Sequence, residues 1–140
     1  MAGYSGKPLA QKLGITAGAT ISVINPSSDY PRLLGSISKS LTFNDTVTKN
    51  STFVHLFVIK RAELQKRLTQ IRSKLADNGV VWVSWPKKAS GVETDVTEDV
   101  IRAVALPMEF VDVKVCAVDD VWSGLKLVIR REHRKDSSRK

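Results

Sequence analysis

The alternation of apolar and polar residues predicts strands separated by helices. The β-branched run Thr20–Asn25 stops at Pro26, which is typical of a strand. The run Phe53–Ile59 is largely apolar at both alternating sets of positions. A strand that is apolar on both faces belongs in the middle of a sheet that helices cover on both sides. A third apolar run, Val80–Trp85, stops at Pro86.

The segment between the second and third apolar runs has the spacing of a helix. Leucine and isoleucine recur at intervals of four, three and four within Arg61–Ala76, which predicts one amphipathic helix. We expect Asp77-Asn78-Gly79 to close it, with Gly79 at positive φ. The strand, helix, tight turn and next strand then form a right-handed βαβ unit with parallel strands.

A further helix is predicted at Val96–Leu106. Asp95 is expected to cap it, because Glu98 follows three residues later, as in a capping box. Two last strands, Val111–Val118 and Leu125–Arg131, are separated by a short link and should pair antiparallel.

Weaker patterns complete the chain. Lys7–Gly14 and Asp29–Ile37 predict short helices, and Ser40–Phe43 is a possible short strand. Together the elements predict an α/β fold: a doubly wound, mostly parallel sheet with helices on both faces and a C-terminal antiparallel hairpin. We expect one Rossmann-like domain over residues 1–131 and a basic disordered tail over residues 132–140.

Two resemblances follow from these patterns. The order of elements over Phe53–Arg131 resembles the closing half of a truncated class I methyltransferase-like fold. MAGYSGKPLAQKLGI, VVWVSWPKKASGVETDVTEDVIRAVALP and VDVKVCAVDDVWSGLKLVIRR resemble a family of small bacterial proteins known only as a domain of unknown function. The second resemblance implies a signature segment around Lys87–Asp95, and it implies no activity, cofactor or catalytic residue.

Composition limits the possible classes of protein. With one cysteine among 140 residues, an internal disulfide and a multi-cysteine zinc site are excluded, and no metal site is expected. No apolar run is long enough to span a membrane, and the N-terminal segment does not read as a secretory signal. These features favour a cytoplasmic protein.

Half of the net charge of +8 lies in the segment Arg130–Lys140, which holds six basic and two acidic residues. This segment is either a solvated end or a tether that holds nucleic-acid phosphates. Its basic residues are Arg130, Arg131, Arg134, Lys135, Arg139 and Lys140.

The strand ends predict an anion site. Carboxyl ends of parallel strands meet at one edge of a sheet, where ligands of open α/β folds bind. Basic residues and helix N-termini should gather there. The candidate ligand-binding residues are Asn25, Lys60, Arg61, Lys87, Lys88, Ser90, Gly91 and Thr94. The alternative is a solvated loop whose lysines serve solubility.

S-adenosylmethionine is not the expected ligand. A methyltransferase needs a Gly-rich turn after its first strand, so that backbone amides approach the cofactor. Here that turn is Asn25-Pro26-Ser27-Ser28-Asp29, which has no glycine, and Pro26 lacks an amide donor. Asp45, the nearest candidate for a ribose-binding acid, falls in a segment that reads as a polar loop.

The sequence shows no set of residues typical of a catalytic site, which favours a protein that is not an enzyme without deciding the question. His55 and Cys116 lie within predicted strands and are interpreted as core residues. Trp82 and Trp85 have opposite parity and so belong to opposite faces, while Trp122 lies in the predicted hairpin turn.

Three functions remain open after this reading. The first is an α/β domain that binds a small anionic ligand, such as a nucleotide or phosphorylated metabolite. The second is a degenerate S-adenosylmethionine-dependent methyltransferase. The third is a nucleic-acid-binding accessory protein that uses the basic tail and the charges of the long helix.

Overall fold

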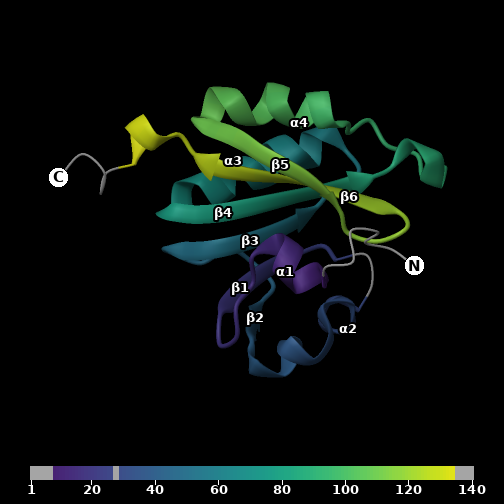
Figure 1. The fold of residues 1–140 in the computed structure, drawn as a ribbon. Helices are drawn as coiled ribbons and strands as arrows, with labels where there is room; N and C mark the ends of the chain where they lie inside the picture. Colours follow the sequence, from purple (N-terminus) through teal and green to yellow (C-terminus); the bar gives the residue numbers. More distant parts are fainter. Residues whose placement is uncertain (1–7, 27–28, 135–140) are drawn as a thin grey trace.

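The computed structural model describes residues 8–26 and 29–134. Within these residues, six strands form one sheet in the order β2-β1-β3-β4-β6-β5. Its elements, in chain order, are α1 (Leu9–Leu13), β1 (Thr20–Ile24), α2 (Tyr30–Leu34), η1 (Gly35–Ser40), β2 (Thr42–Asn44), β3 (Ser51–Phe57), α3 (Arg61–Lys74), β4 (Leu75–Pro86), η2 (Lys88–Ser90), α4 (Glu98–Ala105), η3 (Leu106–Met108), β5 (Phe110–Ala117), β6 (Trp122–Ile129) and η4 (Arg131–His133). Figure 1 shows this arrangement, in which the η elements are 3-10 helices.

The sheet has the predicted topology. Strands β2, β1, β3 and β4 are parallel, whereas β6 runs antiparallel to both β4 and β5. Strand β3 lies between β1 and β4, as its apolar pattern predicted. The doubly wound α/β fold with a C-terminal antiparallel hairpin is therefore confirmed.

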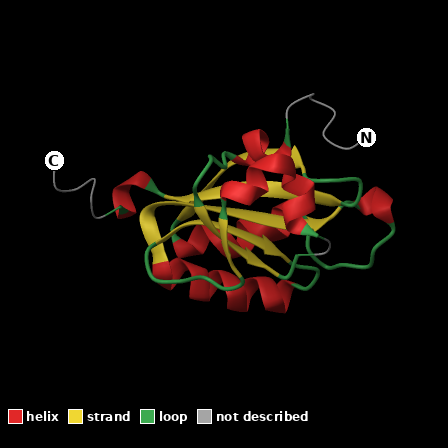
Figure 2. Cartoon of the chain, turned by 90° about the horizontal axis from the view of Figure 1, so that it is seen from below, coloured by secondary structure: helices red, strands yellow, loops and turns green. Residues whose placement is uncertain are grey.

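Helices cover both faces of the sheet, as Figure 2 shows. One core lies between the sheet and α1 and α2, and it contains Trp82 and Phe57. The other lies under α3 and α4 and contains Trp85. The two tryptophans thus occupy opposite faces because side chains alternate along β4.

The prediction for Asp77-Asn78-Gly79 is wrong. The backbone turns extended at Leu75, which pairs with Ser51, so β4 begins before this segment. Gly79 is needed for space and not for positive φ, because a Cβ there would lie 2.6 Å from the side chain of Leu75. The buried Leu75 side chain occupies the place that a side chain at position 79 would need.

The residues after β6 form a short helix. Arg131–His133 forms η4, which follows the end of β6 directly. Residues 135–140, which include the basic residues Lys135, Arg139 and Lys140, lie outside the described part of the chain. None of the helices found in residues 8–26 and 29–134 is long and apolar enough to cross a membrane.

Candidate functional site

The carboxyl ends of β1, β3 and β4 meet at one edge of the sheet, because these strands pair in parallel. The chain leaves β1 toward β2 on one side and then crosses back to β3 on the other. The edge between β1 and β3 is therefore a topological switch point. In open α/β sheets ligands bind in the crevice at such a point.

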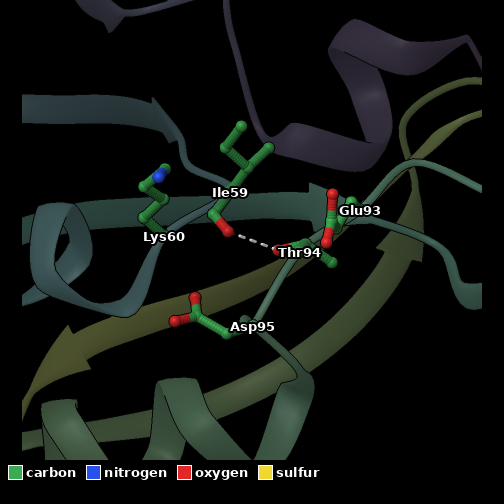
Figure 3. Close-up of a pocket in the computed structure, with 5 residues that line it drawn as sticks. All are labelled: Ile59, Lys60, Glu93, Thr94 and Asp95. Atoms are coloured by element: carbon green, nitrogen blue, oxygen red, sulfur yellow. Dashed lines mark hydrogen bonds between the residues drawn. The ribbon is translucent and has the colours of Figure 1, made fainter.

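A pocket of about 410 Å³ opens at this edge. It is lined by Ile59 and Lys60 after β3, and by Glu93, Thr94 and Asp95 before α4. The Thr94 hydroxyl donates a hydrogen bond of 2.6 Å to the Ile59 carbonyl, which ties the two segments together (Figure 3). One lysine and two carboxylates line the pocket, so its charge is mixed and not cationic.

Asp95 holds the start of α3. Its carboxylate accepts a hydrogen bond of 2.6 Å from the backbone N–H of Arg61, the first residue of that helix. The prediction that Asp95 caps the following helix is wrong, because Thr97 is the N-cap of α4 and accepts from the Val100 N–H. The positive end of the α3 dipole thus faces a carboxylate of the protein itself.

Lys87 is tied to the C-terminal hairpin. Its ammonium group donates to the Asp119 carbonyl at 2.8 Å, and its backbone N–H donates to the Val121 carbonyl at 2.7 Å. These bonds fix the loop after β4 against the link between β5 and β6. Lys88, the neighbouring residue, is exposed on η2.

Ser90 and Gly91 shape the same loop. The Ser90 hydroxyl donates to the Lys87 carbonyl at 2.6 Å and accepts from the Val92 N–H. Gly91 ends η2 at a φ of 77°, a conformation that favours glycine. Both residues therefore have a structural use in the turn.

Asn25 links β1 to α3. Its backbone has a φ of 58°, and its side chain contributes, less than Arg67 does, to lowering the pKa of the Glu63 carboxyl on α3. Glu63 accepts a hydrogen bond of 2.7 Å from Arg67, which is the largest cause that holds the pKa of its carboxyl below the usual range. Polar side chains from α3 thus reach the switch point.

Of the predicted ligand-binding residues, the pocket brings together Lys60 and Thr94. Asn25 and Arg61 lie at the same edge, after β1 and at the start of α3. Lys87, Lys88, Ser90 and Gly91 follow β4 and are not among the residues that line the pocket. Whether these residues bind a ligand stays a prediction.

The sequence patterns did not point to Glu93, and they set Asp45 aside as part of a polar loop. Glu93 lines the pocket. Asp45 is exposed and follows β2 directly, and because Asn44 pairs with Ser22, it leaves the sheet at the level of Val23 near the end of β1. The signal for Asp45 was its distance of 20 residues from Asn25, since a ribose-binding acid follows the first turn of a dinucleotide fold at about that interval.

The core interpretation of His55 agrees with its contacts. The Tyr30 hydroxyl lies 2.7 Å from Nδ1 and the Ser84 hydroxyl lies 2.7 Å from Nε2, and all three side chains are buried. Burial lowers the pKa of His55 to about 3 and raises that of Tyr30. This neutral histidine has no exposed surface and cannot act as a base toward a ligand.

The other chemically distinctive residues also have structural surroundings. Cys116 is half-buried in β5, and burial raises the pKa of its thiol. Trp122 begins β6 and packs edge-on against Phe57, whereas the sequence placed it in a turn. Among the residues described, no group of three or more His, Cys, Asp or Glu side chains could hold a metal ion.

Comparison with known proteins gives evidence at the level of the fold. No family model matches the chain, so the resemblance to the bacterial domain family stays a prediction. No curated protein matches it either.

Solved structures do match. A protein from Sulfolobus solfataricus assigned as a type 11 methyltransferase superposes with a TM-score of 0.60 at 13% identity, over 93% of this chain and 94% of its own. The DhpI-SAH complex gives a TM-score of 0.59 at 9% identity, over 88% and 82% of the two chains. The LepI complex with SAM gives 0.55 at 11% identity, over 93% of this chain and 49% of its own.

The chain has a methyltransferase-like Rossmann fold. The expectation that S-adenosylmethionine is an unlikely ligand is contradicted at the level of the fold, because the structural neighbours include complexes with SAM and with SAH. That expectation rested on the turn after β1 and on the placement of Asp45 in a loop, whereas the fold around both is similar to that of methyltransferases.

Proposed function

We propose that this protein binds S-adenosylmethionine at the carboxyl edge of β1, β3 and β4, and that it belongs functionally with the methyltransferases. The observation that carries the proposal is the methyltransferase-like sheet with a mixed-charge pocket next to its switch point. A resemblance in fold alone would be weak support, so the chemistry of the edge has to fit the ligand.

The charges of the edge suit this ligand. The amino-acid part of S-adenosylmethionine carries an ammonium and a carboxylate, and its sulfonium adds a positive charge. Glu93 offers a partner for positive charge and Lys60 one for the carboxylate. A polyphosphate would meet two carboxylates and one lysine in the same pocket, which is an unfavourable arrangement for an anion.

Asp45 suits the ribose. An exposed carboxylate at the end of β2, beside β1, can accept hydrogen bonds from the two ribose hydroxyls. The turn after β1 departs from the usual arrangement, because Pro26 has no N–H and Asn25 takes a φ of 58° without being glycine. Residues 27 and 28 of this turn lie outside the described part of the chain.

When bound, S-adenosylmethionine supplies an electrophilic methyl group. The residues named here bind and orient it: Asp45 holds the ribose, and Lys60 and Glu93 hold the amino-acid end. The buried His55 takes no part.

Isothermal titration calorimetry of the full chain with S-adenosylhomocysteine and S-adenosylmethionine tests the proposal. We expect binding by the wild type and at least a tenfold loss in Asp45→Asn, because a hydrogen bond to a charged group contributes about 1.5–3 kcal/mol. Glu132→Gln is the matched control: it removes an exposed carboxylate on η4, at the opposite edge of the sheet.

The absence of heat at millimolar ligand with folded wild-type protein would refute the proposal. Equal affinity of wild type and Asp45→Asn would refute the ribose assignment.

A further inference from the structure

Helix α3 presents an outward stripe that contains no acidic residue. Eight positions on this side of the helix are all exposed. Three carry cations, Arg61, Lys66 and Lys74, and the rest are small or neutral polar residues: Ala62, Gln65, Thr69, Gln70 and Ser73. The acid of the helix, Glu63, lies beside the stripe and pairs with Arg67.

The basic surface continues onto the C-terminal segment. Glu109 joins the two parts: its carboxylate pairs with Arg72 of α3 through one oxygen and with His133 of η4 at 3.3 Å through the other. The Glu109 carbonyl also accepts a hydrogen bond of 2.7 Å from the Arg130 N–H. These contacts hold η4 beside the end of α3, and Figure 1 shows η4 at the side of the sheet where β4 begins.

A hollow of about 490 Å³ lies at that end of the helix. Lys49, Arg72 and Lys74 line it, together with Asn50 and Ser73. Asp77 is its acidic residue. Arg130 and Arg131 are exposed on the segment that Glu109 anchors, where Glu132 lies 3.7 Å from the Arg130 guanidinium. Cations from three regions of the sequence therefore border one end of the α3 stripe.

We propose that the α3 stripe and the adjoining η4 segment bind the phosphate backbone of a nucleic acid. Lysine and arginine neutralise phosphates, while amide and hydroxyl side chains add hydrogen bonds to phosphate oxygens. The 14 residues of α3 span about 21 Å, which matches about six phosphate intervals along one strand.

The composition of the stripe argues against other partners. A protein interface needs aromatic or large apolar residues at its centre, and the stripe has none. A membrane-surface helix needs an apolar face toward the lipid, but the apolar residues of α3, Leu64, Leu68 and Ile71, are buried in the core. The stripe offers only charge and hydrogen bonds, which suit a hydrated, repeating anion.

This inference goes beyond the proposed function and does not depend on the methyl donor. Backbone contacts carry no sequence information, so we expect similar affinity for different sequences of equal length.

The test is fluorescence anisotropy of the full chain with a labelled 20-nucleotide single-stranded RNA and a 20-base-pair DNA duplex, at several salt concentrations and without methyl donor. The variant Lys66→Gln/Lys74→Gln removes two cations from the stripe. The control Lys39→Gln/Lys114→Gln removes the same charge from η1 and β5, both exposed and outside the stripe. Circular dichroism checks that all forms are folded.

We expect the stripe variant to bind at least fivefold more weakly, with a salt slope shallower by about 1.4 for single-stranded RNA and 1.8 for the duplex. The control should change affinity less than twofold. An equal loss in both variants would show attraction by net charge without a defined face and would overturn the proposal. The proposal would also be overturned if neither nucleic acid bound at low salt, or if the stripe were needed for binding to anionic lipid vesicles and not for binding to nucleic acid.

Discussion

At the scale of the residue, His55 shows how a polar group is tolerated in a core. It is fully buried between an α2 tyrosine and a β4 serine, and each ring nitrogen has a hydroxyl partner 2.7 Å away. A buried polar group with all partners made costs little, whereas a buried positive charge costs much. The fold therefore depends on the neutral form of this ring.

This dependence predicts a loss of stability in acid. The pKa of His55 is about 3 in the folded protein and about 6.5 in an unfolded chain. As pH falls below 6.5, the unfolded state takes up the proton first, so stability declines by up to about 1.4 kcal/mol per pH unit until pH 3. His55→Gln does not titrate and should flatten this decline.

Urea unfolding of both proteins between pH 7 and pH 4 measures the effect. The two curves share every other titrating group, so their difference reports His55. Parallel pH profiles would contradict the prediction. NMR of the histidine ring nitrogens gives an independent check, because His55 should remain neutral at pH 4.5 in the folded wild type.

At the scale of the element, Asp95 stabilises a helix other than the one it precedes. Asp95→Ala should cost about 1 kcal/mol in urea unfolding, because the Arg61 N–H loses its carboxylate partner. Hydrogen exchange identifies the helix: protection should fall at Arg61 and stay unchanged at Val100, whose N–H is held by Thr97. Faster exchange at Val100 instead would restore the capping-box reading.

Asp95 also shows what the sequence can and cannot predict about elements. Strand and helix positions were predictable because burial imposes a local period, as in the leucine spacing of α3. The partner of Asp95 lies 34 residues away, and that of Lys87 lies 32 residues away. No local pattern encodes such contacts, so both residues were open to an interpretation in terms of their sequence neighbours.

Position 79 illustrates a different limit. Asp-Asn-Gly is a common turn signal, but the pairing of Leu75 with Ser51 draws this segment into β4. Here a tertiary contact overrides a local preference. The candidate site shows the same limit. Lys60 and Thr94 were predicted from the sequence and line the pocket, whereas the weak strand pattern at Ser40–Phe43 did not show that this strand pairs with β1 and places Asp45 at the end of the sheet.

At the scale of the whole molecule, charge is divided between two regions. The pocket at the carboxyl edge mixes Lys60 with two carboxylates, while the α3 stripe is basic and the segment around η4 carries three arginines, Arg130, Arg131 and Arg134, against Glu132. The division agrees with the two proposals, a small-ligand site at the edge of the sheet and a polyanion surface on α3. The net charge of +8 therefore does not indicate an anion pocket at the strand ends, because much of the positive charge lies elsewhere on the molecule.

Lys87 and Lys88 allow a structural role of the loop after β4 to be distinguished from a role in ligand binding. The ammonium group of Lys87 joins the loop after β4 to the hairpin, so Lys87→Ala should lower the free energy of unfolding by about 1 kcal/mol. Lys88 is exposed, so Lys88→Ala should change it by less than about 0.5 kcal/mol. Urea unfolding measures both, and calorimetry should find the affinity of Lys88→Ala for S-adenosylhomocysteine unchanged.

The anion site predicted from the strand ends gives the opposite result: ADP or inorganic phosphate would raise the melting temperature of the wild type, and the rise would disappear in Lys88→Ala. Because Lys88→Ala leaves the hairpin contact intact, a lost rise could not be attributed to damaged folding, and it would assign the loop to ligand binding.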